Sequence, residues 1–210
     1  MFKTNTQSLQ PLPKPVLNHA ILGRHIHIYP ISESDINSTY VSWLKDPETS
    51  EFIEGGGKEN NLKSVREYIV SHRKKGLEVF ALKTSKDQKF IGTVGINNLD
   101  PLATAFGIMV GDPAARRIGL GGESYVLMMH YFFDKLGSYN LRNKVIIEND
   151  RACKTFETIG IERTSTLPDP VIIRDKSYHI GIYEISIDQW LSKHNSQFKR
   201  LLKSVEIVNL

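Results

Sequence analysis

The chain has 210 residues, of which 40% are hydrophobic and 24% charged, a composition typical of one well-cored domain. Its net charge of +4 favours anionic ligands, but no arginine-rich block or aromatic-interleaved basic stripe indicates nucleic acid. No apolar run is long enough to cross a membrane, and the single cysteine, Cys153, excludes an internal disulfide. We therefore expect a cytoplasmic protein without a membrane or nucleic-acid partner.

The first part of the chain predicts an arm, a strand and a helix. Residues 1–20 contain three prolines and lack the apolar core of a signal peptide, so we expect an arm on the surface. Alternating apolar residues over 21–29 predict a strand. Ser32 and Asp35 are typical of a helix start. The apolar stripe of this helix consists of Ile36, Tyr40, Trp43 and Leu44.

The middle of the chain predicts a helix, three strands and a further helix. The helix over 62–75 ends in cations and then glycine, as a helix C-terminus prefers. Two strands, over 77–84 and 89–97, are joined by a short polar turn and predict a hairpin, and a third strand follows over 103–110. The segment 125–136 is apolar almost all round, which indicates a buried helix.

The last part predicts a strand over 140–147, a helix over 150–159, strands over 161–167 and 177–186, and a final helix over 187–202. The central strand–helix–strand unit must be parallel, whereas the hairpins around it are antiparallel. We therefore expect one α+β domain with a mixed, largely antiparallel sheet and helices on both faces. The final helix covers this domain or a partner subunit.

The stretch Ala114–Ser124 places two arginines ahead of three glycines, between a predicted strand and a predicted helix. Glycines let a ligand approach the backbone, and the N–H groups at a helix start favour an anion. A Walker A loop requires a lysine, but Gly122 is followed by Glu123. A dinucleotide fingerprint requires a third glycine where Ser124 stands. The stretch therefore matches neither the Walker A loop nor the dinucleotide fingerprint. One alternative is a tight strand-to-helix turn with solvated arginines and no ligand.

What does fit is Arg-x-x-Gly-x-Gly, formed by Arg116, Gly119 and Gly121, which resembles the acyl-CoA loop of the GNAT acetyltransferase superfamily. The segment Glu148–Ile161, with an asparagine at the end of a strand and then a short helix, resembles the family's second signature. Trp43–Glu48 resembles a Trp-Leu-x-Asp-Pro-Glu segment of the branch named for ribosomal-protein N-terminal acetyltransferases. The resemblance covers 21–186 and implies a GNAT domain there, preceded by the arm 1–20 and followed by 187–210.

The resemblance implies that two neighbouring parallel strands, over 106–110 and 140–145, splay apart and hold the pantetheine arm of acetyl-CoA near Met109 and Val110. The N–H groups from Ile118 to Gly122 would hold the pyrophosphate. The implied cofactor-binding residues are Met109, Val110, Arg116, Arg117, Ile118, Gly119, Leu120, Gly121, Gly122, Asn149, Arg151 and Lys154. Arg151 and Lys154 also fit solvated cations on an exposed helical face.

For catalysis the resemblance implies that Asn149 steadies the cofactor beside the thioester, a role that an ordinary helix N-cap can share. A backbone N–H near Met109 would hold the thioester carbonyl oxygen. The chain departs from many relatives at Phe156, where they carry a tyrosine that protonates the thiolate, and at Ala105, where they carry a glutamate base. Glu54 is the candidate substitute base.

Other groups near the expected acceptor mouth are Glu51, Asn97 and Asn98. Together these features predict an acetyl-CoA-dependent N-acetyltransferase that needs no metal and moves an acetyl group directly to a small amine, such as a nucleotide-linked amino sugar. Two alternatives are a protein N-terminal acetyltransferase and a non-catalytic acyl-CoA-binding protein. A homodimer is one arrangement that the last helix allows.

Overall fold

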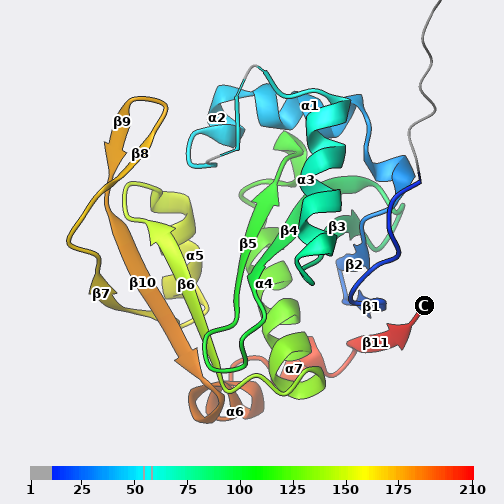
Figure 1. The fold of residues 1–210 in the computed structure, drawn as a ribbon. Helices are drawn as coiled ribbons and strands as arrows, with labels where there is room; N and C mark the ends of the chain where they lie inside the picture. The colour runs from blue at the N-terminus through cyan, green and yellow to red at the C-terminus, as the bar shows by residue number, and fades with distance from the viewer. Residues whose placement is uncertain (1–10, 54, 58) are drawn as a thin grey trace, which may run out of the picture.

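The computed structural model describes residues 11–53, 55–57 and 59–210 (Figure 1). Its strands form a six-stranded antiparallel sheet in the order β11-β1-β2-β3-β4-β5, a three-stranded sheet in the order β6-β10-β7, and the hairpin β8-β9. The larger sheet contains β1 (His19–Leu22), β2 (Ile26–Pro30), β3 (Val79–Thr84), β4 (Phe90–Asn98), β5 (Ala105–Val110) and β11 (Glu206–Asn209). The other strands are β6 (Asn140–Ile146), β7 (Glu162–Thr166), β8 (Val171–Ile173), β9 (Lys176–Tyr178) and β10 (Ile180–Ser186).

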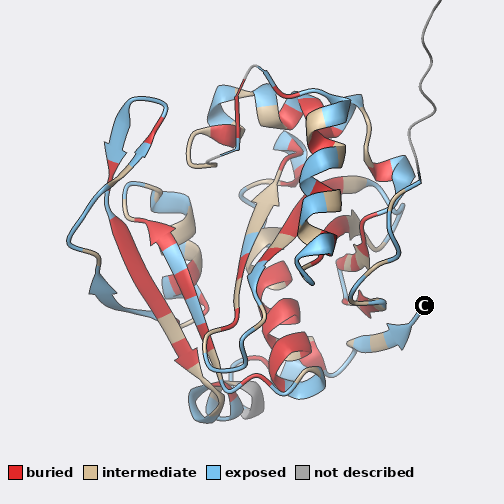
Figure 2. Ribbon diagram, in the orientation of Figure 1, coloured by how far each residue is buried: buried red, intermediate tan, exposed pale blue. Residues whose placement is uncertain are grey.

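Helices cover both faces, as predicted (Figure 1). They are α1 (Ser38–Lys45), α2 (Pro47–Ser50), α3 (Leu62–Lys74), α4 (Leu120–His130), α5 (Asp150–Thr158), α6 (Ile187–Asn195) and α7 (Lys199–Leu202). Short turns are η1 (Glu33–Asp35), η2 (Pro113–Ala115) and the π-helical η3 (Tyr131–Lys135). The apolar helix α4 lies behind β4 and β5 and is buried over most of its length (Figure 2). On the other face, α1 and α3 pack a smaller apolar cluster against β3.

Two predictions for the first part of the chain are wrong in detail. The strand predicted over 21–29 is a hairpin of β1 and β2, because the chain turns at Gly23, whose N–H donates to the carbonyl of Ile26 at 2.9 Å. Ser32 starts only the single turn η1. The helix α1 begins after Asn37, whose side-chain oxygen accepts from the N–H of Tyr40 and caps the helix.

The end of the chain also differs from its prediction. The final helix is broken into α6 and α7, and the chain then continues as β11, which pairs antiparallel with β1. Trp190 of α6 stacks on Phe133 with ring centroids 5.6 Å apart, and its indole N–H donates to Asp134 at 2.9 Å. The segment therefore packs on its own domain, and of the two options left open by the sequence the structure shows this one.

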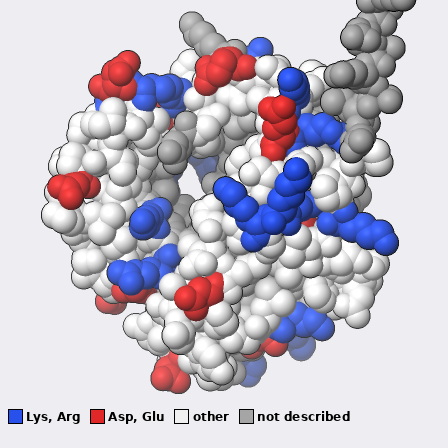
Figure 3. All heavy atoms as spheres, in the orientation of Figure 1, with Lys and Arg blue, Asp and Glu red and all other residues white. Residues whose placement is uncertain are grey.

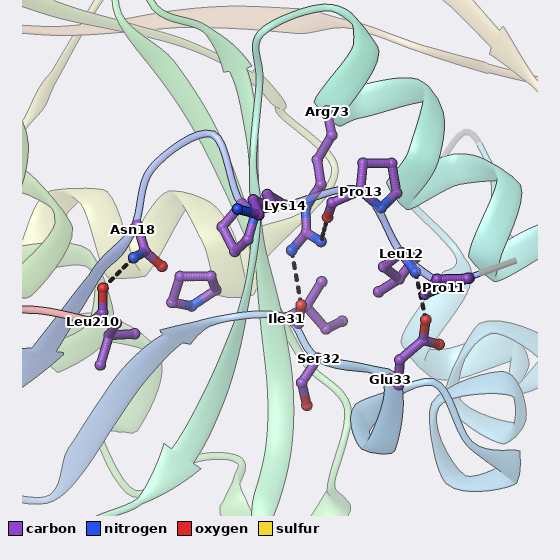
Figure 4. A pocket seen from close by; sticks show the side chains of 12 residues that line it. Pro11, Leu12, Pro13, Lys14, Asn18, Ile31, Ser32, Glu33, Arg73 and Leu210 are labelled. Atoms are coloured by element: carbon purple, nitrogen blue, oxygen red, sulfur yellow. Dashed lines mark hydrogen bonds between the residues drawn. The ribbon is translucent and has the colours of Figure 1, made fainter.

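The described part of the N-terminal arm, from Pro11, is fastened by a buried ion pair between Arg73 and Glu78. Figure 4 shows Arg73 reaching the arm at Pro13 and the end of β2 at Ile31. The guanidinium of Arg73 donates to the carbonyls of Pro13 at 2.6 Å and Ile31 at 2.8 Å. Glu78 accepts from the N–H of Val16 at 2.8 Å. Because each charge is compensated by the other and by backbone dipoles, the pair holds the arm against β2 and α3.

We predict that Glu78→Ala lowers the free energy of unfolding by about 3–5 kcal/mol, because it leaves the Arg73 charge buried without its partner. Urea unfolding measures the change. Glu67→Ala is the matched control, since Glu67 forms only an exposed pair with Lys63 at 3.8 Å and costs less than about 1 kcal/mol. Equal midpoints for the two variants would contradict this account of the arm.

Candidate active site

The two sheets touch along β5 and β6 at one point and then part. Thr104 and Leu141 form an isolated parallel bridge, in which the N–H of Thr104 donates to Asn140 at 3.1 Å and the N–H of Arg142 donates to Thr104 at 2.8 Å. Beyond it the strands diverge toward the end of β5 (Figure 1), and a hollow lies between the two sheets (Figure 3). The parallel arrangement and the splay expected from the resemblance are both present.

A buried side chain keeps the strands apart where their backbone pairing stops. Asn143 is 3% exposed, and its Oδ1 accepts from the N–H of Phe106 at 2.9 Å. An amide side chain thus takes the place of a main-chain partner, so β6 stands further from β5 than a paired strand does. Sequence reasoning missed Asn143; the signal was a polar residue on the inward face of a strand between Leu141 and Val145.

Successive N–H groups of β5 point alternately toward β4 and toward the opening, which decides which of them a ligand can reach. Phe106 presents its N–H to β6, so the N–H groups of Ile108 and Val110 point the same way. The register pairs Met109 with Thr93, and two residues later the N–H of Gly111 donates to the carbonyl of Ile91. Hydrogen-bonded pairs alternate along an antiparallel ladder, so Met109 is hydrogen-bonded to Thr93. The backbone of Met109 is therefore used in the sheet. The expected N–H near Met109 is therefore that of Ile108 or Val110 and not that of Met109 itself.

The glycine-rich stretch is the start of a helix rather than a loop followed by one. The helix predicted from 125 begins at Leu120, after Gly119 in the left-handed conformation (φ 87°). Gly121 and Gly122 lie in its first turn, and the nearest atoms to an added Cβ would be 3.7 and 3.9 Å away. The first N–H groups of a helix have no partner within it, so this open turn presents several donors to an anion.

Three arginines surround the carboxylate of Glu48, which belongs to α2. Its Oε1 lies 3.0 Å from Arg151 Nη1, at the start of α5. The same oxygen lies 3.7 Å from Arg116 and 3.9 Å from Arg117, both just ahead of α4. Asp46 lies 3.9 Å from Arg116 as well, so two carboxylates face three guanidinium groups. This leaves one positive charge in excess beside the open turn of α4, which fits phosphate groups.

Two of the three predicted arginines, Arg116 and Arg117, differ in how they are held. Arg116 is largely buried and donates to the carbonyls of Val110 at 3.1 Å and Gly111 at 2.8 Å, and to the hydroxyl of Thr49. Arg117 is 82% exposed and adopts a positive φ of 62°. Arg116 therefore ties β5 to α2, while Arg117 is free to turn toward a ligand.

Asn149 and Lys154 lie on α5, across the opening from α4. Asn149 is the N-cap of α5, and its side-chain oxygen accepts from the N–H of Ala152 at 3.1 Å. Lys154 is exposed on the same helix, and Ile118 is exposed ahead of α4. The structure thus brings the two predicted signatures to the two sides of one opening.

Phe156 lies buried between two tyrosines. Its ring centroid is 4.7 Å from that of Tyr125 and 4.8 Å from that of Tyr183. Burial raises the pKa of Tyr125 well above its ordinary value, and burial together with a hydrogen bond to Cys153 raises the pKa of Tyr183 to about 12. Both hydroxyls are therefore protonated at neutral pH, and neither acts as a base there.

The substitute base suggested by the sequence, Glu54, lies outside the described residues. Nearby, the segment after α2 is held by the β8-β9 hairpin, whose Arg174 donates to the carbonyls of Ser50 and Glu51. Phe52 packs edge-on against Tyr178 at 5.5 Å. Sequence reasoning missed this contact, because the hairpin itself was not predicted.

The sequence over residues 25–162 matches the family model described as "Acetyltransferase (GNAT) domain". The chain belongs to the GNAT acetyltransferase family. It is accordingly an acetyltransferase, and acetyl-CoA is the co-substrate of its family. No curated protein matches the sequence.

Solved GNAT structures share the fold at low sequence identity. A GCN5-related N-acetyltransferase from Brucella melitensis is 16% identical, with a TM-score of 0.76 over 93% of this chain and 90% of that one. A chimera of the spermidine N-acetyltransferase SpeG from Vibrio cholerae and hSSAT is 15% identical, with a TM-score of 0.69 over 80% and 99%. The ribosomal-protein-S5-alanine acetyltransferase of Vibrio fischeri is 16% identical, with a TM-score of 0.61 over 81% and 98%.

Within the described ranges, no helix of this GNAT chain is long and apolar enough to span a membrane. The same residues contain no group of three or more His, Cys, Asp or Glu side chains arranged to hold a metal ion.

We predict that Asn143→Ala lowers the free energy of unfolding by about 1–3 kcal/mol, because the buried N–H of Phe106 loses its acceptor. Chemical denaturation measures the change, and Asn98→Ala is an exposed amide control on β4. If Asn143→Ala unfolds at the wild-type midpoint, the bond does not hold the strands in place.

Proposed function

We propose that this GNAT enzyme transfers the acetyl group of acetyl-CoA to the primary amine of a small acceptor, such as a nucleotide-linked amino sugar, by direct attack in a ternary complex. The observation that supports the proposal is the opening between β5 and β6, with the unpaired N–H groups of α4 and a cluster of arginines at its wide end. An extended thioester with a polyanionic tail matches that shape and charge.

In this proposal the N–H groups of Leu120, Gly121 and Gly122 hold the pyrophosphate. Arg117 and Arg151 contribute charge-assisted hydrogen bonds, and Lys154, exposed three residues after Arg151 on α5, adds to their positive charge. The pantetheine arm lies along β5, where Ile108 and Val110 present backbone groups, and Asn149 steadies it from the other side.

The amine must be neutral to attack, since an alkyl ammonium with a pKa of about 10 has no lone pair. Its nitrogen forms a bond to the acetyl carbon while the carbon–sulfur bond breaks, and the thiolate leaves with the electron pair. The N–H of Ile108 stabilises the carbonyl oxygen as charge develops. The nitrogen gives up a proton to water and the thiolate takes one from water, since Phe156 offers no hydroxyl.

A non-catalytic acyl-CoA-binding protein is the second candidate, and Ala105 and Phe156 favour it because they lack the carboxylate and the hydroxyl that many relatives use. Tight binding of acetyl-CoA without acetylation of any amine would distinguish this candidate from an acetyltransferase. A protein N-terminal acetyltransferase is the third, supported by the shared fold with the enzyme from Vibrio fischeri.

We predict that acetyl-CoA binds the wild type with micromolar affinity and that Gly121→Asp abolishes the binding, because the new carboxylate points at the pyrophosphate. Isothermal titration calorimetry measures both. Ser204→Asp, on the exposed turn before β11, adds the same charge away from the site and retains binding. No binding to the wild type would overturn the proposed function.

We further predict that Glu48→Gln tightens the binding of CoA about two- to fivefold, since Glu48 competes with the phosphates for three arginines through exposed ion pairs of about 0.5–1 kcal/mol. The gain shrinks with added salt. Titration with dephospho-CoA tells which phosphate the arginines hold, and Glu67→Gln is the control. Weaker binding would show that Glu48 organises the site instead of competing for it.

A further inference from the structure

One side of the opening is filled by the protein itself. Phe106 of β5 packs against Tyr125 at 4.5 Å and against Phe132 at 5.2 Å, and Phe156 closes the cluster from α5. An amine cannot approach the edge of β5 through this core. It must come from the opposite face, which α1 and α3 only partly cover.

On that face β4 and β5 carry two glycines directly opposite each other, Gly95 and Gly107. Gly107 is exposed, and the nearest atom to an added Cβ would be Asn97 Nδ2, 3.8 Å away. Gly107 therefore leaves the backbone bare at the border of the opening, and together with Gly95, which lies under Tyr68, it forms a flat shelf on the sheet.

Tyr68 of α3 forms one wall of the shelf. Its hydroxyl is 2.9 Å from the position that a Cβ on Gly95 would take. The ring packs against His72 with centroids 4.2 Å apart, and His72 Nδ1–H donates to the carbonyl of Tyr68 at 3.3 Å. Burial raises the pKa of Tyr68 and lowers that of His72, so both are neutral at pH 7 and neither repels an amine by charge.

Lys144 of β6 forms the other wall. Counted from the bridge of Thr104 with Leu141 and the bond between Phe106 and Asn143, Lys144 is the residue of β6 that faces Gly107 across the opening. Leu141, Asn143 and Val145 are buried toward α4 and α5, so by alternation Lys144 projects to the exposed face.

The charge around the shelf is mainly basic, and Figure 3 shows Lys and Arg side chains on both sides of the opening. Arg142 is paired with Glu184 at 3.2 Å. Lys144 is exposed, and the described residues include no carboxylate in an ion pair with it. On the far side, Lys75 lies close enough to His72 to lower its pKa further. An acceptor on this shelf meets a surplus of positive charge.

We propose that the acceptor is a primary amine that also carries an anionic group, a phosphate or a carboxylate. The amine lies over Gly107 within reach of the Tyr68 hydroxyl, and the anion pairs with Lys144. The inference rests on the proposed function and adds the class of acceptor and its positioning residues. The Lys144 charge also disfavours the ammonium form of the amine, which helps to supply the neutral nucleophile.

The test compares amines that differ by one anionic group. The phosphate pairs are ethanolamine with phosphoethanolamine and glucosamine with glucosamine 6-phosphate. Ethanolamine with β-alanine is the carboxylate pair. Thiol release from acetyl-CoA gives kcat/KM for each. We expect the wild type to prefer the anionic member of each pair about tenfold and Lys144→Gln to abolish the preference. Lys135→Gln, an exposed lysine on η3, retains it.

Tyr68→Phe separates positioning from folding. We expect it to raise KM for every amine severalfold while leaving the calorimetric Kd for acetyl-CoA unchanged, and Tyr139→Phe, which is 62% exposed, to change neither. Equal use of charged and uncharged amines by the wild type, or a preference that survives in Lys144→Gln, overturns this inference alone. No transfer to any of the amines by a protein that binds acetyl-CoA overturns this inference and favours the non-catalytic candidate. Failure of the wild type to bind acetyl-CoA overturns the proposed function itself.

Discussion

The architecture depends on two parallel strands that begin to pair and then stop. A continuous ladder from Thr104 onward would close β5 against β6 and leave no site. Instead the Asn143 side chain satisfies the N–H of Phe106, and the strands diverge with no unpaired donor left at that point. The backbone groups of Ile108 and Val110 then face the opening, where they are available to an extended ligand. One buried amide thus opens the sheet between β5 and β6, where we propose that acetyl-CoA binds.

The helix α2 connects the parts of the site that the strands separate. Glu48 reaches the arginines ahead of α4 and on α5, and Thr49 accepts from Arg116. On the far side the residues after α2 accept from Arg174 of the β8-β9 hairpin. A ligand that draws the arginines away from Glu48 therefore also acts on the segment beside the acceptor face. In the proposed function, this would link binding of the phosphates to the acceptor side.

Local patterns predicted most of the fold. The hairpin of β3 and β4, helix α3, helix α5 and the parallel unit around α4 follow from periodicity and from turn residues. The misses arise where local patterns do not decide. The strand β11 exists because β1 offers it an open edge. The helix α4 begins at Leu120 although the two glycines of its first turn have low helix propensity. The glycine and asparagine signatures, which predicted the cofactor side, lie on the two sides of the opening between β5 and β6. The acceptor shelf was not predictable, because it joins Gly107, Tyr68 and Lys144 from three separate segments.

Hydrogen exchange with and without acetyl-CoA tests the central claim most directly, because it reports on single backbone N–H groups without requiring a known acceptor. The account predicts added protection at Ile108 and Val110 on β5 and at residues 120–122 of α4, with none at Met109, whose N–H is already used in the sheet. Protection confined to other segments, or none at saturating acetyl-CoA, would contradict the claim that the cleft between β5 and β6 holds the thioester.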